Sequence, residues 1–190
     1  MHVTPLQPAA RATTERTGSR AQDLVARGIC YRYPQAADEV IHDFSHRFLP
    51  GTLTALVAPS GAGKSTLLSL LSLLLAPRTG TISLGDVVVE RHRTSTVRTL
   101  RRTHFNQILQ NNACFESRTA VDNVATALLS SGVTMSSARR AAGAALASVG
   151  LSSRAEMPAR LLSGGEQQRM TIARALLTDR PYLLADCPTR

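Results

Sequence analysis

The stretch of this chain best suited to chemistry is residues 58–66, which read APSGAGKST. It holds Lys64, the only lysine among the 22 basic residues. Glycines followed by a lysine and hydroxyl residues at this spacing are typical of a loop whose backbone N–H groups surround phosphates. A lysine ammonium is compact enough to reach β- and γ-phosphates inside such a loop, whereas the planar guanidinium of arginine is wider. The hydroxyl of Ser65 is an oxygen donor of the kind that Mg²⁺ prefers.

A phosphate-binding loop needs a strand before it and a helix after it, and the flanking sequence predicts both. Residues 52–57 are β-prone, and residues 64–76 predict a buried helix that is apolar on nearly all sides. Ala58 departs from the pattern, which has glycine there, and alanine would be strained if the position requires a positive φ. The alternative is a glycine-rich turn before a helix. We favour nucleotide binding, by the residues Ala58, Pro59, Ser60, Gly61, Ala62, Gly63, Lys64, Ser65 and Thr66.

The composition is that of a basic globular protein. The chain has 190 residues, of which 43% are hydrophobic, and a net charge of +9. Its longest apolar stretch, residues 67–76, is shorter than the ~20 residues that a membrane-spanning helix needs. The three cysteines lie far apart without metal-ligand spacing, which favours reduced thiols in a cytosol. The arginines are scattered and aromatics are 4%, so we expect no nucleic-acid partner.

The hydrophobic pattern predicts one domain after a disordered tail over residues 1–22. Strands that alternate with helices over residues 23–190 predict an α/β fold with a mainly parallel sheet. Residues 111–160 are helical in pattern and predict a small subdomain. The predicted strands are 24–33, 40–49, 52–57, a hairpin over 80–89, 104–110 and 181–186, and the predicted helices are 64–76, 96–103, 119–131, 135–150 and 164–177.

Two further motifs lie in the second half of the chain. Residues 162–169 read LSGGEQQR at a predicted helix start, where a serine and two bare glycine N–H groups could bind a second phosphate. The alternative is a capped helix and nothing more. Residues 183–186 read LLAD, a strand that ends in an acid suited to hold magnesium through water. The alternative there is an aspartate that begins a turn.

The three motifs, in this order, resemble those of an ABC-type ATPase subunit over roughly residues 24–189, and are similar to the branch that energises lipoprotein and peptide exporters. The resemblance implies a P-loop NTPase core with N-terminal antiparallel strands and a small helical subdomain. It implies ATP and Mg²⁺ as cofactors, and a homo- or heterodimer with another ATP-binding subunit. It also implies a transmembrane permease partner and a cytoplasmic location at the inner face of the cell membrane.

The resemblance also assigns roles to individual residues. Tyr33 falls where the family stacks an aromatic ring on adenine, and Gln110, Asp186 and the position of Cys187 fall at catalytic places. Ser65, Gln110 and Asp186 are the implied magnesium ligands. The signature residues, which face the nucleotide on the partner subunit, are Leu162, Ser163, Gly164, Gly165, Glu166 and Gln168.

Departures from the family pattern put ATP hydrolysis in doubt. Cys187 stands where the family has the glutamate that polarises the attacking water, and a neutral thiol is a poor proton acceptor. The chain stops at Arg190, before the aspartate loop and the histidine of the family, so we expect a fragment, a decayed product or a short variant. Because the signature is intact, a functional chain is expected to pair with a different, intact ATPase subunit.

Two other functions stay open at this point. One is a nucleotide-gated ATPase of the DNA-repair or translation type, and the other is an inactive regulatory fragment. The interval between residues 66 and 162 carries neither heptads nor a Cys-x-x-Cys pair, which favours transport over DNA scanning.

Overall fold

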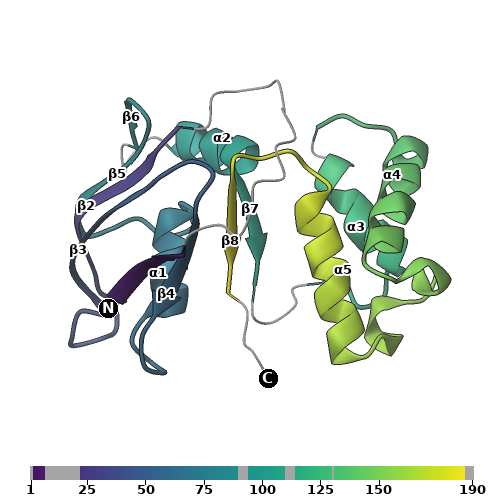
Figure 1. Cartoon of the computed structure of the whole chain (residues 1–190), viewed down its shortest axis with the longest axis horizontal. Helices are drawn as coiled ribbons and strands as arrows, with labels where there is room; N and C mark the ends of the chain where they lie inside the picture. The colour runs from purple at the N-terminus through teal and green to yellow at the C-terminus, as the bar shows by residue number, and fades with distance from the viewer. Residues whose placement is uncertain (1, 7–21, 90–93, 110–113, 130, 187–190) are drawn as a thin grey trace. The chain divides into compact units, whose positions relative to one another are not determined.

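The structure is a computed structural model of the 190-residue chain, and it describes residues 2–6, 22–89, 94–109, 114–129 and 131–186 (Figure 1). It divides into two compact units, Met1–Phe105 and Asn106–Arg190. Among the described residues, no helix is both long and apolar enough to cross a membrane.

The first unit contains a four-stranded antiparallel sheet. Its strands are β2 (Leu24–Tyr31), β3 (Ile41–Phe48), β5 (Thr79–Leu84) and β6 (Val87–Val88), in the order β3-β2-β5-β6. The predicted strands and the predicted hairpin are therefore present, with slightly shorter bounds. Leu24 and Ile29 of β2 and Ile82 of β5 are fully buried, so one face of the sheet supplies the core of this unit.

A second, two-stranded sheet precedes the phosphate-binding loop. Strand β1 (His2–Leu6) pairs antiparallel with β4 (Leu53–Val57), with Leu6 opposite Leu53. The prediction of a disordered tail over residues 1–22 is wrong for residues 2–6, and residues 7–21 lie outside the described residues. The physical reason is that the edge of β4 carries backbone groups that can pair with a short strand. Because residues 1–22 are polar on average, their composition gave no indication of this five-residue strand.

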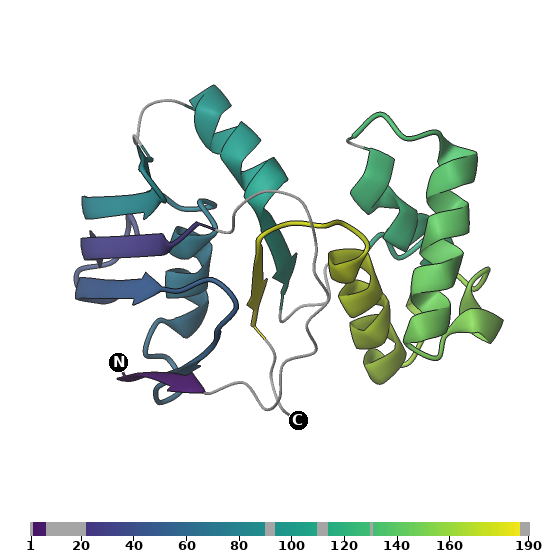
Figure 2. The ribbon, with the colours of Figure 1, turned by 45° about the horizontal axis from the view of Figure 1, so that its top comes forward.

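Helix α1 (Lys64–Leu71) follows the loop and lies beside the antiparallel strands (Figures 1 and 2). Its Leu67, Leu70 and Leu71 are fully buried, as the apolar pattern predicts. The helix ends before the predicted residue 76, because Leu73 has a φ of 62° and leaves the helical region. A left-handed leucine costs about 1–2 kcal/mol. Burial of the side chain, which is 5% exposed, contributes about 1.5–3 kcal/mol and outweighs that strain.

The parallel part of the fold is a pair of strands, β7 (Phe105–Ile108) and β8 (Tyr182–Ala185), which point the same way in Figures 1 and 2. The backbone N–H of Asp186 donates to the carbonyl of Ile108 at 2.8 Å. The amide of the buried Asn106 donates to the Thr178 carbonyl at 2.9 Å and accepts from the Thr178 hydroxyl at 2.7 Å. The bond from Asp186 fixes the end of β8, where the acidic motif lies, and the bonds to Thr178 hold the segment before the strand.

The second unit is built mainly of helices. Helices α3 (Ala120–Leu129), α4 (Met135–Ser148) and α5 (Gly164–Leu176) pack side by side around Val124, Leu146, Leu162 and Met170 (Figure 1). Two short 3₁₀ helices, η1 (Ser152–Arg154) and η2 (Ala159–Leu161), connect α4 to α5. The three predicted helices are confirmed, while the bounds of a subdomain at 111–160 stay a prediction.

A buried asparagine fixes the entry to the helical bundle. Asn123 of α3 is fully buried, and its carbonyl oxygen accepts from the Phe115 N–H at 2.7 Å. Its amide donates to the carbonyls of Phe115 and Thr119, both at 3.0 Å. Every polar atom of this side chain is thus engaged, as burial requires. The bonds hold the segment that leads into α3.

The basic helix predicted at 96–103 is α2 (Thr94–His104), which belongs to the first unit and precedes β7. It has no buried residue among those that the structure describes. One face of this amphipathic helix lines a cavity.

Candidate functional site

The loop between β4 and α1 has the backbone that a phosphate-binding loop needs. Gly61 and Gly63 have φ values of 80° and 86°, a region that favours glycine. A Cβ on Gly63 would also lie 2.7 Å from the Val40 side chain, so no other residue fits there. Positive φ at non-glycine residues occurs, within the described part of the chain, at Asp43 and Leu73. Ala58 is therefore not strained, and its departure from the pattern leaves the loop intact.

The side chain of Lys64 bonds to the first residues of the loop. Its ammonium donates to the carbonyls of Ala58 and Pro59, both at 2.8 Å. These partners are neutral, and Lys64 forms no ion pair with a described residue. The loop thus presents an uncompensated positive charge together with the N-terminal N–H groups of α1. An anion with several oxygens, such as a phosphate chain, matches these donors.

An aromatic ring lies beside this loop. The Tyr33 hydroxyl is 3.0 Å from the Thr66 hydroxyl, and its ring contacts the Tyr31 ring edge-to-face, with centroids 5.1 Å apart. Tyr33 remains 42% exposed, so part of its ring is open to a ligand. The first unit therefore brings together Tyr33, the loop and the exposed Ser65, as the sequence predicts. Stacking of a base on Tyr33 stays a prediction.

The remaining predicted residues around the bound nucleotide belong to the second unit or lie outside the described residues. Asp186 is half-buried and directly follows β8. Gln110 and Cys187 lie outside the described residues, so their predicted roles are untested. Within the first unit, the loop donors and the Ser65 hydroxyl are groups that suit a phosphate chain with a divalent cation.

The signature motif forms the N-terminus of α5. The Ser163 hydroxyl accepts from the Glu166 N–H at 3.3 Å, while a Glu166 carboxylate oxygen accepts from the Ser163 N–H at 2.8 Å. The capping box uses the N–H groups of Ser163 and Glu166, while Gly164 and Gly165 are exposed residues of the first turn without side chains of their own. The arrangement can donate hydrogen bonds to an anion that approaches along the helix axis.

Two other signature residues make contacts within the helical unit. Leu162 is 5% exposed and packs in the core of the helical bundle, which anchors the turn before Ser163. Gln168 is half-buried, and its backbone carbonyl accepts from the Thr171 hydroxyl at 2.8 Å. A direct contact of the Gln168 side chain with nucleotide stays a prediction.

Sequence reasoning missed Arg154, which supports the signature from η1. Its guanidinium donates to Glu166 at 3.2 Å, on the carboxylate oxygen that Ser163 does not use. The hydrogen bonds from the Ser163 backbone and side chain, followed by the one from Arg154, hold the pKa of Glu166 below its usual value. Glu166 therefore stays ionised and keeps the cap closed. No sequence signal joins two residues twelve positions apart across a 3₁₀ turn.

A second ionic cluster, also missed, joins α3 and α4 to the segment before the signature. Arg139 of α4 pairs with Asp122 of α3 and bonds both carboxylate oxygens of Glu156, at 2.7 and 2.8 Å. Burial alone would raise the pKa of Asp122, but the hydrogen bonds from Thr119 and Arg139 outweigh it, so the pKa is lowered. The cluster ties the bundle together on the side that leads to the signature.

Removal of this cluster is expected to weaken the fold in a pH-dependent way. Because the pKa of Asp122 is lowered in the folded chain, its contribution is present above the unfolded pKa of ~4 and is lost as pH falls through the folded value. Arg139→Ala should lower the free energy of unfolding by roughly 1 kcal/mol near pH 7, since the partly exposed pairs are screened. Urea unfolding at pH 7 and pH 3 measures both effects.

The adjacent Arg140 offers a matched control. It is exposed and forms no ion pair with a described residue. Arg140→Ala should therefore leave the urea midpoint unchanged. Equal midpoints for the Arg139 and Arg140 variants would contradict a stabilising role for the cluster.

Comparisons with known proteins agree with this geometry. The profile of the family described as ABC transporter matches residues 41–190. The lipoprotein-releasing system ATP-binding protein LolD of Hyphomonas neptunium is 38% identical over 159 residues, which cover 84% of this chain and 70% of that protein. The L-cystine transport system ATP-binding protein TcyN of Escherichia coli is 37% identical over 156 residues, covering 79% of this chain and 62% of that protein.

The fold is also similar to that of a solved structure. The ATP-binding cassette MJ0796, described as dimeric in a post-hydrolysis state with ADP and Pi, superposes with a TM-score of 0.77 at 26% identity. The match covers 87% of this chain and 74% of that one. The α/β class with N-terminal antiparallel strands and a helical part is thereby confirmed.

Proposed function

The chain belongs to the ABC transporter family, and from this membership we propose that it is an ATP-binding subunit that binds ATP with Mg²⁺ and acts on a separate membrane permease. The observation that carries the proposal is the position of Lys64 in an unstrained glycine loop between β4 and α1. In this assignment Lys64 and the loop N–H groups bind the β- and γ-phosphates. Ser65 and Asp186 hold the metal, with Gln110, and Tyr33 stacks on the base.

The signature supports a role toward a second nucleotide. The capping box and Arg154 hold Ser163 at the start of α5, next to the exposed Gly164 and Gly165. Those donors can complete an ATP site on another ATP-binding subunit, in a face-to-face dimer. The cassette to which this chain is similar is described as a dimer, which supports the proposal.

The residues around the chain's own nucleotide and the signature motif differ in the chemistry that they can supply. Cys187 carries a thiol, which accepts a proton from an attacking water less well than a carboxylate does. The signature keeps Ser163, Gly164 and Gly165, whose hydroxyl and N–H groups can donate to a nucleotide on the partner. We therefore assign the chain to a dimer in which its own ATP is a slow clamp and its signature serves a faster site on an intact partner.

The cellular setting follows from the same assignment. The LolD and TcyN relatives are named as ATP-binding proteins of a lipoprotein-releasing and a transport system, and a MacB relative is named as an ATP-binding/permease protein. We place this chain in the cytoplasm at the inner face of the cell membrane. Which substrate the permease moves is a property of that other subunit.

Self-association in MgATP tests the proposal. Because Cys187 slows turnover, bound ATP should persist and hold two copies of the full chain together through their signatures. The mass measured by light scattering is expected to rise from monomer toward dimer with saturating MgATP, and not with MgADP.

Ser163→Arg supplies the specific control. A bulky cation at the start of α5 blocks the approach of phosphate, so this variant should bind MgATP and yet remain monomeric. A wild-type chain that binds MgATP without any rise in mass, or a Ser163→Arg variant that dimerises like the wild type, would refute face-to-face pairing of two copies of this chain.

A further inference from the structure

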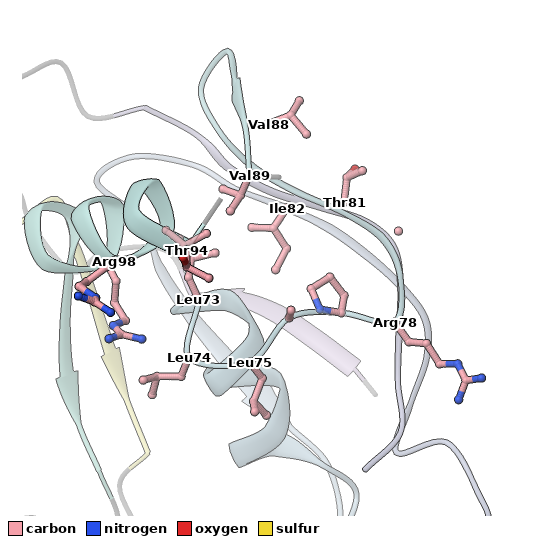
Figure 3. Close-up of a pocket in the computed structure, with 15 residues that line it drawn as sticks. Leu73, Leu74, Leu75, Arg78, Thr81, Ile82, Val88, Val89, Thr94 and Arg98 are labelled. Atoms are coloured by element: carbon pink, nitrogen blue, oxygen red, sulfur yellow. The ribbon is translucent and has the colours of Figure 1, made fainter. Parts of the chain in front are cut away.

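A cavity of about 510 Å³ lies within the first unit, away from the phosphate-binding loop (Figure 3). Its walls come from residues 73–78 after α1, from the hairpin of β5 and β6, and from the start of α2. The cavity shares no lining residue with the loop at 58–66. Its volume is within the range of small-molecule sites, which is roughly 300–1,000 Å³.

The walls of the cavity are mainly aliphatic. Leu73, Ile82, Val89 and Val97 line it, and the labelled side chains in Figure 3 show the hairpin wall facing α2 across the cavity. Its rim is open to water, since Val88 is 55% exposed. No aromatic side chain lines the described part of the cavity, so a nucleobase would find no stacking surface. The wall chemistry fits a hydrocarbon chain.

Two arginines on α2 add positive charge to one side of the cavity. Arg98 and Arg101 are three residues apart and therefore on one helix face, and both line the cavity. Neither makes an ion pair or hydrogen bond with another described residue. No acid lines the described part of the cavity either. Arg78 lies at the opposite side, where Figure 3 shows it pointing away.

At the floor of the cavity, an apolar side chain is present although its backbone conformation favours glycine. Leu73 keeps a left-handed conformation, φ 62°, in which glycine would be free of strain. Its side chain is 5% exposed and lines the cavity. A leucine in this conformation fills the floor with hydrocarbon, whereas glycine would leave a larger polar opening onto the backbone.

From these observations we propose that the cavity binds a single-chain amphiphile with an anionic head group. The hydrocarbon chain lies against Leu73, Ile82 and Val97, and the head group pairs with the guanidiniums of Arg98 and Arg101. Charge-assisted hydrogen bonds to a carboxylate or phosphate are the strong kind that guanidinium favours. The proposal is independent of ATP binding, because the two sites share no residue.

Calorimetry on the full chain tests the proposal with defined probes below their micelle concentrations. Dodecanoate represents free fatty acids, and lauroyl-lysophosphatidate represents anionic lysolipids. At least one should bind with a stoichiometry of one, about tenfold or more tighter than dodecyltrimethylammonium, which has the same chain and the opposite charge. Octanoate should bind more weakly than dodecanoate, because it buries fewer methylene groups. The tighter anionic probe identifies the source.

Variants on α2 locate the site. The double variant Arg98→Gln, Arg101→Gln should weaken the anionic probe by about tenfold, with circular dichroism unchanged. Arg102→Gln is the matched control, because Arg102 is on the same helix but does not line the cavity, and its affinity should equal that of the wild type.

Three results would overturn the proposal. The first is equal binding of the cationic and anionic probes. The second is undiminished binding by the double variant. The third is saturable binding of an acidic amphipathic peptide while both lipid probes fail, which would assign the cavity to a helix of a partner protein instead.

Discussion

ATP turnover by this chain is expected to be slower, by roughly 10²–10⁴-fold, than turnover by a relative that has glutamate at the position of Cys187. A carboxylate that accepts the proton of the attacking water contributes a factor of this size. The neutral thiol of an unperturbed cysteine does not replace it near pH 7. Phosphate release at saturating MgATP, measured side by side with a relative whose sequence has glutamate at this position, gives the ratio.

Cys187→Ala is the matched control for this prediction. If the thiol takes no part as a base, the alanine variant should turn over ATP at the same slow rate as the wild type. A further large drop in the variant would show that the thiol acts in the reaction. A wild-type rate equal to that of the relative would contradict the prediction outright.

Local sequence patterns predicted the parts of the site that local chemistry fixes. The glycines, the lysine and the apolar helix of residues 58–71 form one continuous segment, so its pattern carries its structure. The capping box is likewise contained between Ser163 and Glu166. In both places a residue and its partner are at most six positions apart, and propensity and contact agree.

Features that depend on distant residues could not be predicted in this way. The ion pairs of Arg139 span seventeen positions in both directions, and Arg154 reaches Glu166 across a 3₁₀ turn. The early end of α1 follows from burial of Leu73, which the helical pattern of its neighbours conceals. Strand β1 forms because the edge of β4 offers backbone groups for pairing. The composition of residues 1–22 carries no information about that pairing partner.

Lys64→Ala is expected to weaken MgATP binding by about 100-fold or more. The ammonium is the one side-chain cation held at the loop by described contacts, at 2.8 Å from two loop carbonyls. Its loss removes charge-assisted bonds to two phosphates, each of which accounts for about tenfold or more in affinity. Lys64→Arg should also bind poorly, since the wide guanidinium does not fit where the ammonium lies.

Ser163→Arg separates this effect from a general loss of structure. The proposed role of the signature is toward a nucleotide on the other subunit, so Ser163→Arg should still bind MgATP, far more tightly than Lys64→Ala, and lose only the affinity that dimerisation adds. Thermal unfolding of Lys64→Ala, Lys64→Arg and Ser163→Arg without nucleotide measures whether each variant keeps its fold.

Titration calorimetry of MgATP into the full-length chain and into Lys64→Ala measures whether residues 58–66 bind the nucleotide. The account predicts saturable binding at one site per wild-type chain, and an affinity at least 100-fold lower, or undetectable, for the variant. Equal affinities for the two proteins, or no binding to a folded wild-type chain, would contradict the assignment of residues 58–66 as an ATP-binding loop.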